Sequence, residues 1–206
     1  MPPNAPAIRK DRPSGLNQVG TLNEAAGLSH NEYGFGGRRV TEFLFADFPL
    51  TITDSPAYVG TKIYTFPAVL LRMLDAAGSL TLTTTSAIAS TLNAGVTVRW
   101  GLGSATASAT TLATTMIDML PGSGATPAAF TSSTVINVAS AQDNDYLLHG
   151  DAQDAAAIWD GSSTPIECYF NVAIPTGTDI DADATTLLNG KIIAHWESVH
   201  DFSLLG

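Results

Sequence analysis

Short runs in which apolar and polar residues alternate are the feature that most restricts how this 206-residue chain can fold. In Val96–Trp100 the three apolar side chains share one face of an extended strand, and the two polar side chains share the other. Leu80–Thr84 alternates in the same way and is rich in β-branched residues, which disfavour a helix. A period of two over these lengths predicts half-buried β-strands.

Further strand-like segments are separated by turn-forming residues such as Pro, Gly, Asn and Asp. They are Val40–Thr53, Tyr58–Phe66, Val69–Leu74 (which also fits a short helix), Thr111–Leu120, Thr134–Val138, Ile166–Ile174 and Lys191–Trp196. Because amphipathic helices do not separate these segments, we predict an all-β fold, an antiparallel β-sandwich that is jelly-roll-like. Gln142–Asp160 is predicted as a helical or loop insertion, and Pro175–Asn189 as a long acidic loop.

The first 39 residues have a different character. They contain four prolines and the glycine-rich tract Gly34–Gly37, and hydrophobic periodicity is absent. A segment of this kind cannot bury enough surface to order itself, so it is either mobile or held by a partner. We therefore predict two parts, an extended N-terminal arm over residues 1–39 and a β-sandwich domain over residues 40–206.

Charge is unevenly distributed along the chain. The formal net charge is −10, yet residues 1–39 hold five basic and three acidic side chains. An acidic body argues against direct binding of nucleic acid through a basic face. The start of the chain lacks the pattern of a signal peptide, and no apolar run approaches the roughly 20 residues that span a bilayer. We predict no membrane association, and synthesis in a cytoplasm.

Three alternating carboxylates, Asp179, Asp181 and Asp183, form the most metal-like pattern. An EF-hand loop would also need Gly at its sixth position and an acid at its twelfth, where this chain has Ala184 and Gly190. The pattern therefore predicts a solvated acidic loop, with a structural calcium site as the alternative reading.

No catalytic motif is evident. His195 and His200 flank Glu197, but they are five positions apart, and a zinc-protease helix needs a separation of four. A nucleophile elbow and a phosphate-binding loop are both missing from the sequence. We predict a non-enzymatic protein without a cofactor.

Cysteine and tryptophan residues are read as parts of the core. The single cysteine, Cys168, lies in a strand-like segment and is predicted to be a buried thiol. Trp100, Trp159 and Trp196 could form a sugar-stacking platform, but Trp100 shares a face with two valines. Core packing is the better reading of Trp100.

Five strings between about residues 55 and 200 are distinctive as text. They are Lys62–Pro67 (KIYTFP), Gly78–Thr81 (GSLT), Ser90–Ser104 (STLNAGVTVRWGLGS), Cys168–Ile174 (CYFNVAI) and Asp179–Thr185 (DIDADAT). Together they resemble virion structural proteins of tailed bacteriophages, of the capsid decoration or cement type. The resemblance implies a sandwich on the outside of an icosahedral capsid, where it binds the major capsid protein and stabilises the shell.

The residues add a hypothesis for attachment. Basic groups of the arm would pair with acidic or carbonyl groups of the capsid; these are Arg9, Lys10, Arg12, Arg38 and Arg39. Self-association as a dimer or trimer is expected, because virion surfaces present local symmetry axes. The alternatives are a tail or head-fibre component, and a module that binds host glycans.

Overall fold

The computed structural model describes residues 20–35, 37–53, 56–84, 98–120, 124–125, 135–141, 158–174 and 184–199. These residues form β-strands and one short 3-10 helix, Thr114–Met116. The strands are β1 (Thr21–Leu22), β2 (Leu28–Phe35), β3 (Arg38–Ile52), β4 (Tyr58–Thr65), β5 (Leu70–Thr84), β6 (Val98–Gly103), β7 (Gly124–Ala125), β8 (Val135–Ala141), β9 (Ile158–Asp160), β10 (Glu167–Ala173) and β11 (Ala184–Val199).

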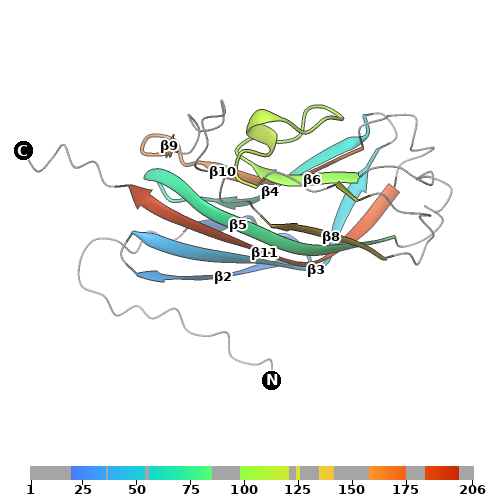
Figure 1. The fold of residues 1–206 in the computed structure, drawn as a ribbon, viewed down its shortest axis with the longest axis horizontal. Coiled ribbons are helices and arrows are strands. Elements are labelled where there is room, and N and C mark those ends of the chain that lie inside the picture. The colour runs from blue at the N-terminus through green and yellow to red at the C-terminus, as the bar shows by residue number, and fades with distance from the viewer. Residues whose placement is uncertain are drawn as a thin grey trace, which may run out of the picture.

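The strands form two antiparallel sheets that pack against each other (Figure 1). Sheet A has five strands in the order β1–β4–β10–β6–β7. Sheet B has six, in the order β2–β3–β11–β5–β8, and β9 pairs with another part of β5. This arrangement confirms the predicted all-β antiparallel sandwich.

Eight of the strands pair in a nested order along the chain. β3 pairs with β11, β4 with β10, β5 with β8, and β6 with β7. Two more ladders, β11 with β5 and β10 with β6, join these pairs into the two sheets. The nesting places residues from opposite ends of the chain side by side.

The core lies between the two sheets. Along β3 the inward positions alternate, and Phe43, Phe45 and Phe48 are at most 4% exposed. Trp100 is 1% exposed and stacks on Phe170 with ring centroids 5.8 Å apart, which confirms the core reading of Trp100. Burying a side chain of this kind stabilises the fold by about 1.5–3 kcal/mol relative to leaving it exposed.

The predicted boundary between arm and sandwich at residues 39 and 40 is corrected for residues 20–39. β1 belongs to sheet A, and β2 pairs with β3 over its whole length. The register puts His30 and Glu32 of β2 opposite the buried Phe43 and Thr41 of β3, so polar residues occupy inward positions and hide the strand pattern. Residues 1–19 lie outside the described part of the chain.

Three local predictions also change. The expected strand Thr111–Leu120 contains the 3-10 helix, which begins at Thr114 with φ of 49°, a value that interrupts extended backbone. β11 begins at Ala184, inside the segment Pro175–Asn189 that was expected to be a loop. Ile158–Asp160, the end of the expected insertion, forms β9.

Candidate functional site

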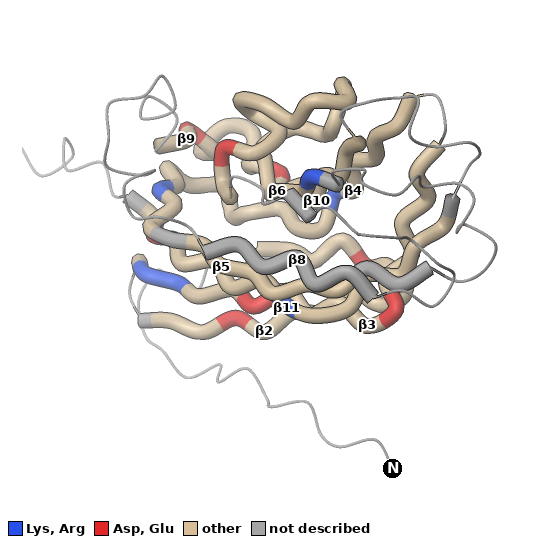
Figure 2. The backbone as a smooth tube through the Cα atoms, turned by 45° about the vertical axis from the view of Figure 1, so that its right-hand side comes forward, with Lys and Arg blue, Asp and Glu red and all other residues tan. Residues whose placement is uncertain are grey.

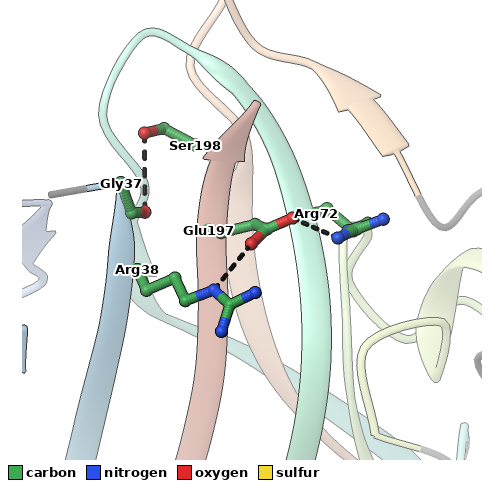
Figure 3. Close-up of polar contacts among 5 residues, drawn as sticks. All are labelled: Gly37, Arg38, Arg72, Glu197 and Ser198. Carbon is green, nitrogen blue, oxygen red and sulfur yellow. Dashed lines mark hydrogen bonds and ion pairs between the residues drawn. The ribbon is translucent and has the colours of Figure 1, made fainter. Parts of the chain in front are cut away.

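One end of sheet B brings three charged side chains from three adjacent strands onto one face. Glu197 on β11 lies opposite Arg38 on β3 and opposite Arg72 on β5. Residues directly opposite each other in neighbouring antiparallel strands project from the same face. Figure 3 shows Glu197 between the two arginines. We call these three residues the charged triad.

The Glu197 carboxylate bridges both guanidinium groups of the triad. Arg38 Nε lies 3.3 Å from Glu197 Oε2, and Arg72 Nη2 contacts Oε1 (Figure 3). The Glu197 side chain is 15% exposed, whereas the side chains of Arg38 and Arg72 are 79% and 45% exposed. The carboxylate is thus largely covered, and two cations reach solvent around one anion.

A backbone contact fixes the strands that carry the triad. The Ser198 N–H donates to the Gly37 carbonyl oxygen at 2.8 Å, and Ser198 Oγ lies 3.5 Å from the same oxygen (Figure 3). This contact holds the start of β3 beside the end of β11. The triad therefore sits on a rigid part of the sheet rather than on a free loop.

A pocket of about 440 Å³ opens beside the triad. Its lining consists of Gly34, Arg38, Arg39, Val40, Leu74 and His195. At Gly34, with φ of 154°, a Cβ atom would lie 2.2 Å from the Arg38 carbonyl oxygen, so a side chain does not fit there. Apolar walls next to guanidinium groups suit a carboxylate carried on an apolar group.

Basic residues are scarce elsewhere in the described chain. Only six described residues are Lys or Arg, and Arg38, Arg39 and Arg72 are three of them (Figure 2). The end of sheet B that carries the triad is thus the most basic part of an otherwise acidic body. Such a patch attracts acidic partners.

The structure places two of the five predicted basic residues at this site. Arg38 and Arg39 lie at the start of β3, whereas Arg9, Lys10 and Arg12 fall outside the described residues. Arg72 was not predicted from the sequence. It follows Arg38 by 34 positions, and the register of two ladders brings it to the same end of the sheet. No local spacing signals that contact.

A buried polar contact links the two sheets behind the patch. The Tyr64 hydroxyl donates to Glu32 Oε2. Burial raises the pKa of Glu32, and the Tyr64 hydrogen bond and the charge of Arg39 oppose that rise. Glu32 Oε1 is buried and has no hydrogen-bond partner within the described part of the chain. The contact ties β2 to the core at an electrostatic cost.

A second buried acid, Asp118, joins the segment after β6 to β9. Its carboxylate accepts from Ser104 N–H at 2.8 Å, from Ser104 Oγ at 2.7 Å and from Trp159 Nε1 at 3.3 Å. Burial raises the pKa of Asp118. All three bonds go to groups that position the chain, so this cluster reads as structural.

Cys168 is 0% exposed, which confirms the predicted buried thiol. Burial is the main cause that raises the pKa of this thiol, and the nearby Asp118 adds to the rise. A raised pKa opposes formation of the reactive thiolate.

The alternative calcium site falls on Asp179, Asp181 and Asp183, which lie outside the described residues. Among the residues that are described, no three His, Cys, Asp or Glu side chains are grouped so that they could hold a metal ion. The same residues also contain no helix that is long and apolar enough to cross a membrane.

Comparison with protein-family models, with curated proteins and with solved structures finds no match to this chain. The features of the molecule that bear on its function are therefore the basic end of sheet B and the strand order.

Proposed function

We propose that this chain is a non-enzymatic structural protein of a tailed-bacteriophage virion, which binds the outside of the capsid and stabilises it. The strings that resemble decoration proteins support the proposal. All five contribute residues to inner strands, which are β4, β5, β6, β10 and β11. The resemblance therefore involves the framework of the sandwich rather than its edges.

The strand order also favours this role. We infer that the nested pairing of eight strands, four to each sheet, is that of a jelly roll. Jelly rolls occur in viral capsid and lectin domains. This is an argument by analogy, because one fold can host many functions.

The basic end of sheet B is the observation that carries attachment. Arg38 and Arg72 project from its outer face. Arg39 lies opposite the buried Trp196, so its side chain projects toward the inner face, where its charge acts on Glu32. The sequence before Gly20 adds the basic run Arg9–Arg12. The exposed basic groups would pair with acidic or carbonyl groups of the major capsid protein.

Each exposed ion pair contributes only about 0–1 kcal/mol. Stable attachment would therefore depend on several contacts per copy, and on linked copies if the protein self-associates. This magnitude predicts that single substitutions weaken binding and that combined ones abolish it.

Binding to heads purified without this protein tests the proposal. Wild-type protein should bind and raise the resistance of the heads to heat. The double variant Arg38→Ala with Arg39→Ala should bind much less, and Arg99→Ala, an exposed arginine of sheet A, should bind as wild type does. Failure of the wild-type protein to bind would contradict the proposal.

The contribution of the N-terminal segment needs its own variant. Since residues 20–39 are part of the sandwich, the deletion should stop at residue 19. We expect the shortened protein to fold and to bind heads more weakly. Unchanged binding would remove these residues from the attachment surface.

The alternatives from the sequence remain testable. Imaging the particle would separate a head location from a tail or head-fibre location, and a glycan array would detect a glycan-binding module. Trp100 and Trp196 are each 1% exposed, so two of the three tryptophans of a sugar platform face the core. This burial favours the capsid proposal over the glycan alternative.

A further inference from the structure

β2 is an open edge of sheet B. It pairs with β3, and no described strand lies beyond it (Figure 1). In an antiparallel pair, alternate residues direct their N–H and C=O groups away from the partner strand. Over residues 29–35, these groups have no backbone partner beyond β3 in the described part of the chain. β2 thus offers a row of unpaired hydrogen-bonding groups.

β2 has few of the features that protect natural edge strands, which are Pro, Lys, a bulge, short length or an inward-pointing charge. Glu32 is an inward-pointing charge, but β2 contains no Pro or Lys and pairs with β3 over eight residues without a register shift. The other edge strands are β1, β7 and β9, which are two or three residues long, and β8, which has seven residues. Tyr33 on β2 is 52% exposed. An edge of this kind is suited to the addition of another strand.

We propose that a second copy of this chain adds its own β2 to this edge, antiparallel, around a two-fold axis beside Asn31. The two copies of sheet B then form one continuous sheet. A two-fold interface uses the same patch on both copies, as a strand paired with itself does. The proposal names the surface for the expected self-association and does not depend on capsid binding.

Charge selects the register. Residues opposite each other across the axis must face the same side of the sheet, so the axis lies beside a residue and not between two. Asn31 and Glu32 are the two centres that overlap most of β2. A centre at Asn31 places His30 opposite Glu32 of the second copy. A centre at Glu32 places two carboxylates opposite each other, which is destabilising.

The partial desolvation of Glu32 strengthens this choice. Its Oε1 atom has no hydrogen-bond partner within the described residues, so a second carboxylate opposite it would add repulsion to a group that is already partly desolvated. An imidazole opposite it supplies a donor instead. The Asn31 centre is therefore the register that the side chains support.

The outward-facing residues along the contact are uncharged. With the centre at Asn31, Ser29 lies opposite Tyr33 of the second copy. Each copy carries a net charge of −10, so the copies repel each other at long range. On this face, the side chains of the two β2 strands therefore place no like charges opposite each other.

Cysteine cross-linking tests the interface and its register on the purified full chain. In the proposed dimer, Asn31→Cys places two thiols directly opposite each other, so oxidation or a short thiol cross-linker should give a covalent dimer. Ser29→Cys alone and Tyr33→Cys alone should give none, because each thiol lies opposite a different position. A mixture of those two variants should cross-link. Cys168 is buried and does not compete.

Light scattering and sedimentation provide the second measurement. The wild-type chain should dimerise with increasing concentration, and His30→Glu should weaken the dimer by about tenfold, because the contact with Glu32 occurs twice in the symmetric pair. His30→Gln is the matched uncharged control and should change dimerisation much less. Circular dichroism would verify that each variant is folded.

Two outcomes would overturn the proposal. One is a wild-type chain that stays monomeric. This outcome includes the case in which the Asn31→Cys variant cross-links to a capsid protein on heads and does not cross-link to a second copy of itself. The other is a dimer in which Ser29→Cys or Tyr33→Cys cross-links to itself and Asn31→Cys does not. Neither outcome bears on whether the protein binds heads, so the capsid proposal is judged separately.

Discussion

The indole N–H of Trp196 on β11 donates a hydrogen bond to Thr41 Oγ on β3 at 2.9 Å, and both residues are at most 1% exposed. Trp196 also packs edge-on against Phe66 of the opposite sheet, with ring centroids 5.3 Å apart. This bond fixes the orientation of one of the largest side chains in the core. It also leaves the molecule sensitive to the loss of a single hydroxyl.

Replacing Thr41 by Val tests this bond. Val has nearly the same shape, but the indole N–H would be buried without an acceptor, which costs about 1–3 kcal/mol. We expect the free energy of unfolding in urea to fall by that amount. Thr51→Val is the control, because Thr51 pairs with Thr185 at an exposed position and should lose little. Equal losses in the two variants would contradict the assignment.

Asn171→Ala should loosen the segment between β6 and the 3-10 helix. The Asn171 side chain is 0% exposed, accepts from Ala107 N–H at 2.7 Å, and donates to the carbonyls of Ala105 and Met116 at 2.9 and 2.7 Å. Losing these bonds leaves three buried or half-buried backbone groups unpaired, at a cost of about 2–4 kcal/mol.

Chemical denaturation would measure the loss in Asn171→Ala, and hydrogen exchange would locate it. Faster exchange should appear first at the Ala107 amide. Asn23→Ala removes one exposed side-chain bond, to the Lys62 carbonyl, and is the matched control. A variant that exchanges at the wild-type rate in this segment would show that Asn171 does not hold it.

Glu32 should make stability decrease as pH rises. Burial raises its pKa in the folded protein above the ordinary value of 4.5, so the folded state holds its proton when the unfolded state has lost it. The stabilising contribution is complete below pH 4.5 and is lost as pH rises through the folded-state pKa. Glu32→Gln should remove this part of the decline, because Gln keeps an acceptor for the Tyr64 hydroxyl.

Urea unfolding across acidic and neutral pH measures the Glu32 effect. The stability of Glu32→Gln relative to wild type should increase with pH over that window. Curves for Glu32→Gln that run parallel to wild type over this window would refute the desolvation of Glu32.

Cys168 should be unreactive in the folded protein. Its thiol is 0% exposed and burial raises its pKa, so a thiol reagent has neither access nor thiolate to attack. We expect a thiol reagent to label Cys168 only after the protein is unfolded in denaturant. Mass spectrometry would measure the extent of labelling. Ser29→Cys, on an exposed position of β2, should give one rapidly labelled thiol as a positive control. Rapid labelling of native wild-type protein would contradict the buried position.

Strands with apolar inward positions could be predicted from the sequence. The segment Val40–Thr53 alternates because every second side chain enters the core, and β3 covers it almost completely. β2 was missed because its inward positions include His30 and Glu32, whose polar groups are accommodated by Tyr64 and Arg39 rather than by apolar contacts. Local periodicity reports hydrophobic burial and cannot report such compensation.

Only some residues of the candidate site could be predicted from the sequence, and the reason differs from the one that applies to β2. Arg38 and Arg39 were singled out as part of a basic segment, but their partner Glu197 lies 159 positions from Arg38. Strand register decides that contact, and register depends on which distant strands pair. The assignment of Arg38 to an extended arm followed in part from the neighbouring glycines, but Gly34 lies in β2 and Gly37 lies in the turn just before β3.

The position of β11 determines when the molecule can fold. β11 is the last of the described strands, yet it lies in the middle of sheet B and joins β3 to β5. A nascent chain therefore has to be synthesised through Val199 before these two long strands acquire their common neighbour. Until then their apolar faces are open to other chains, so high contact order slows folding and makes aggregation during synthesis the main competing process.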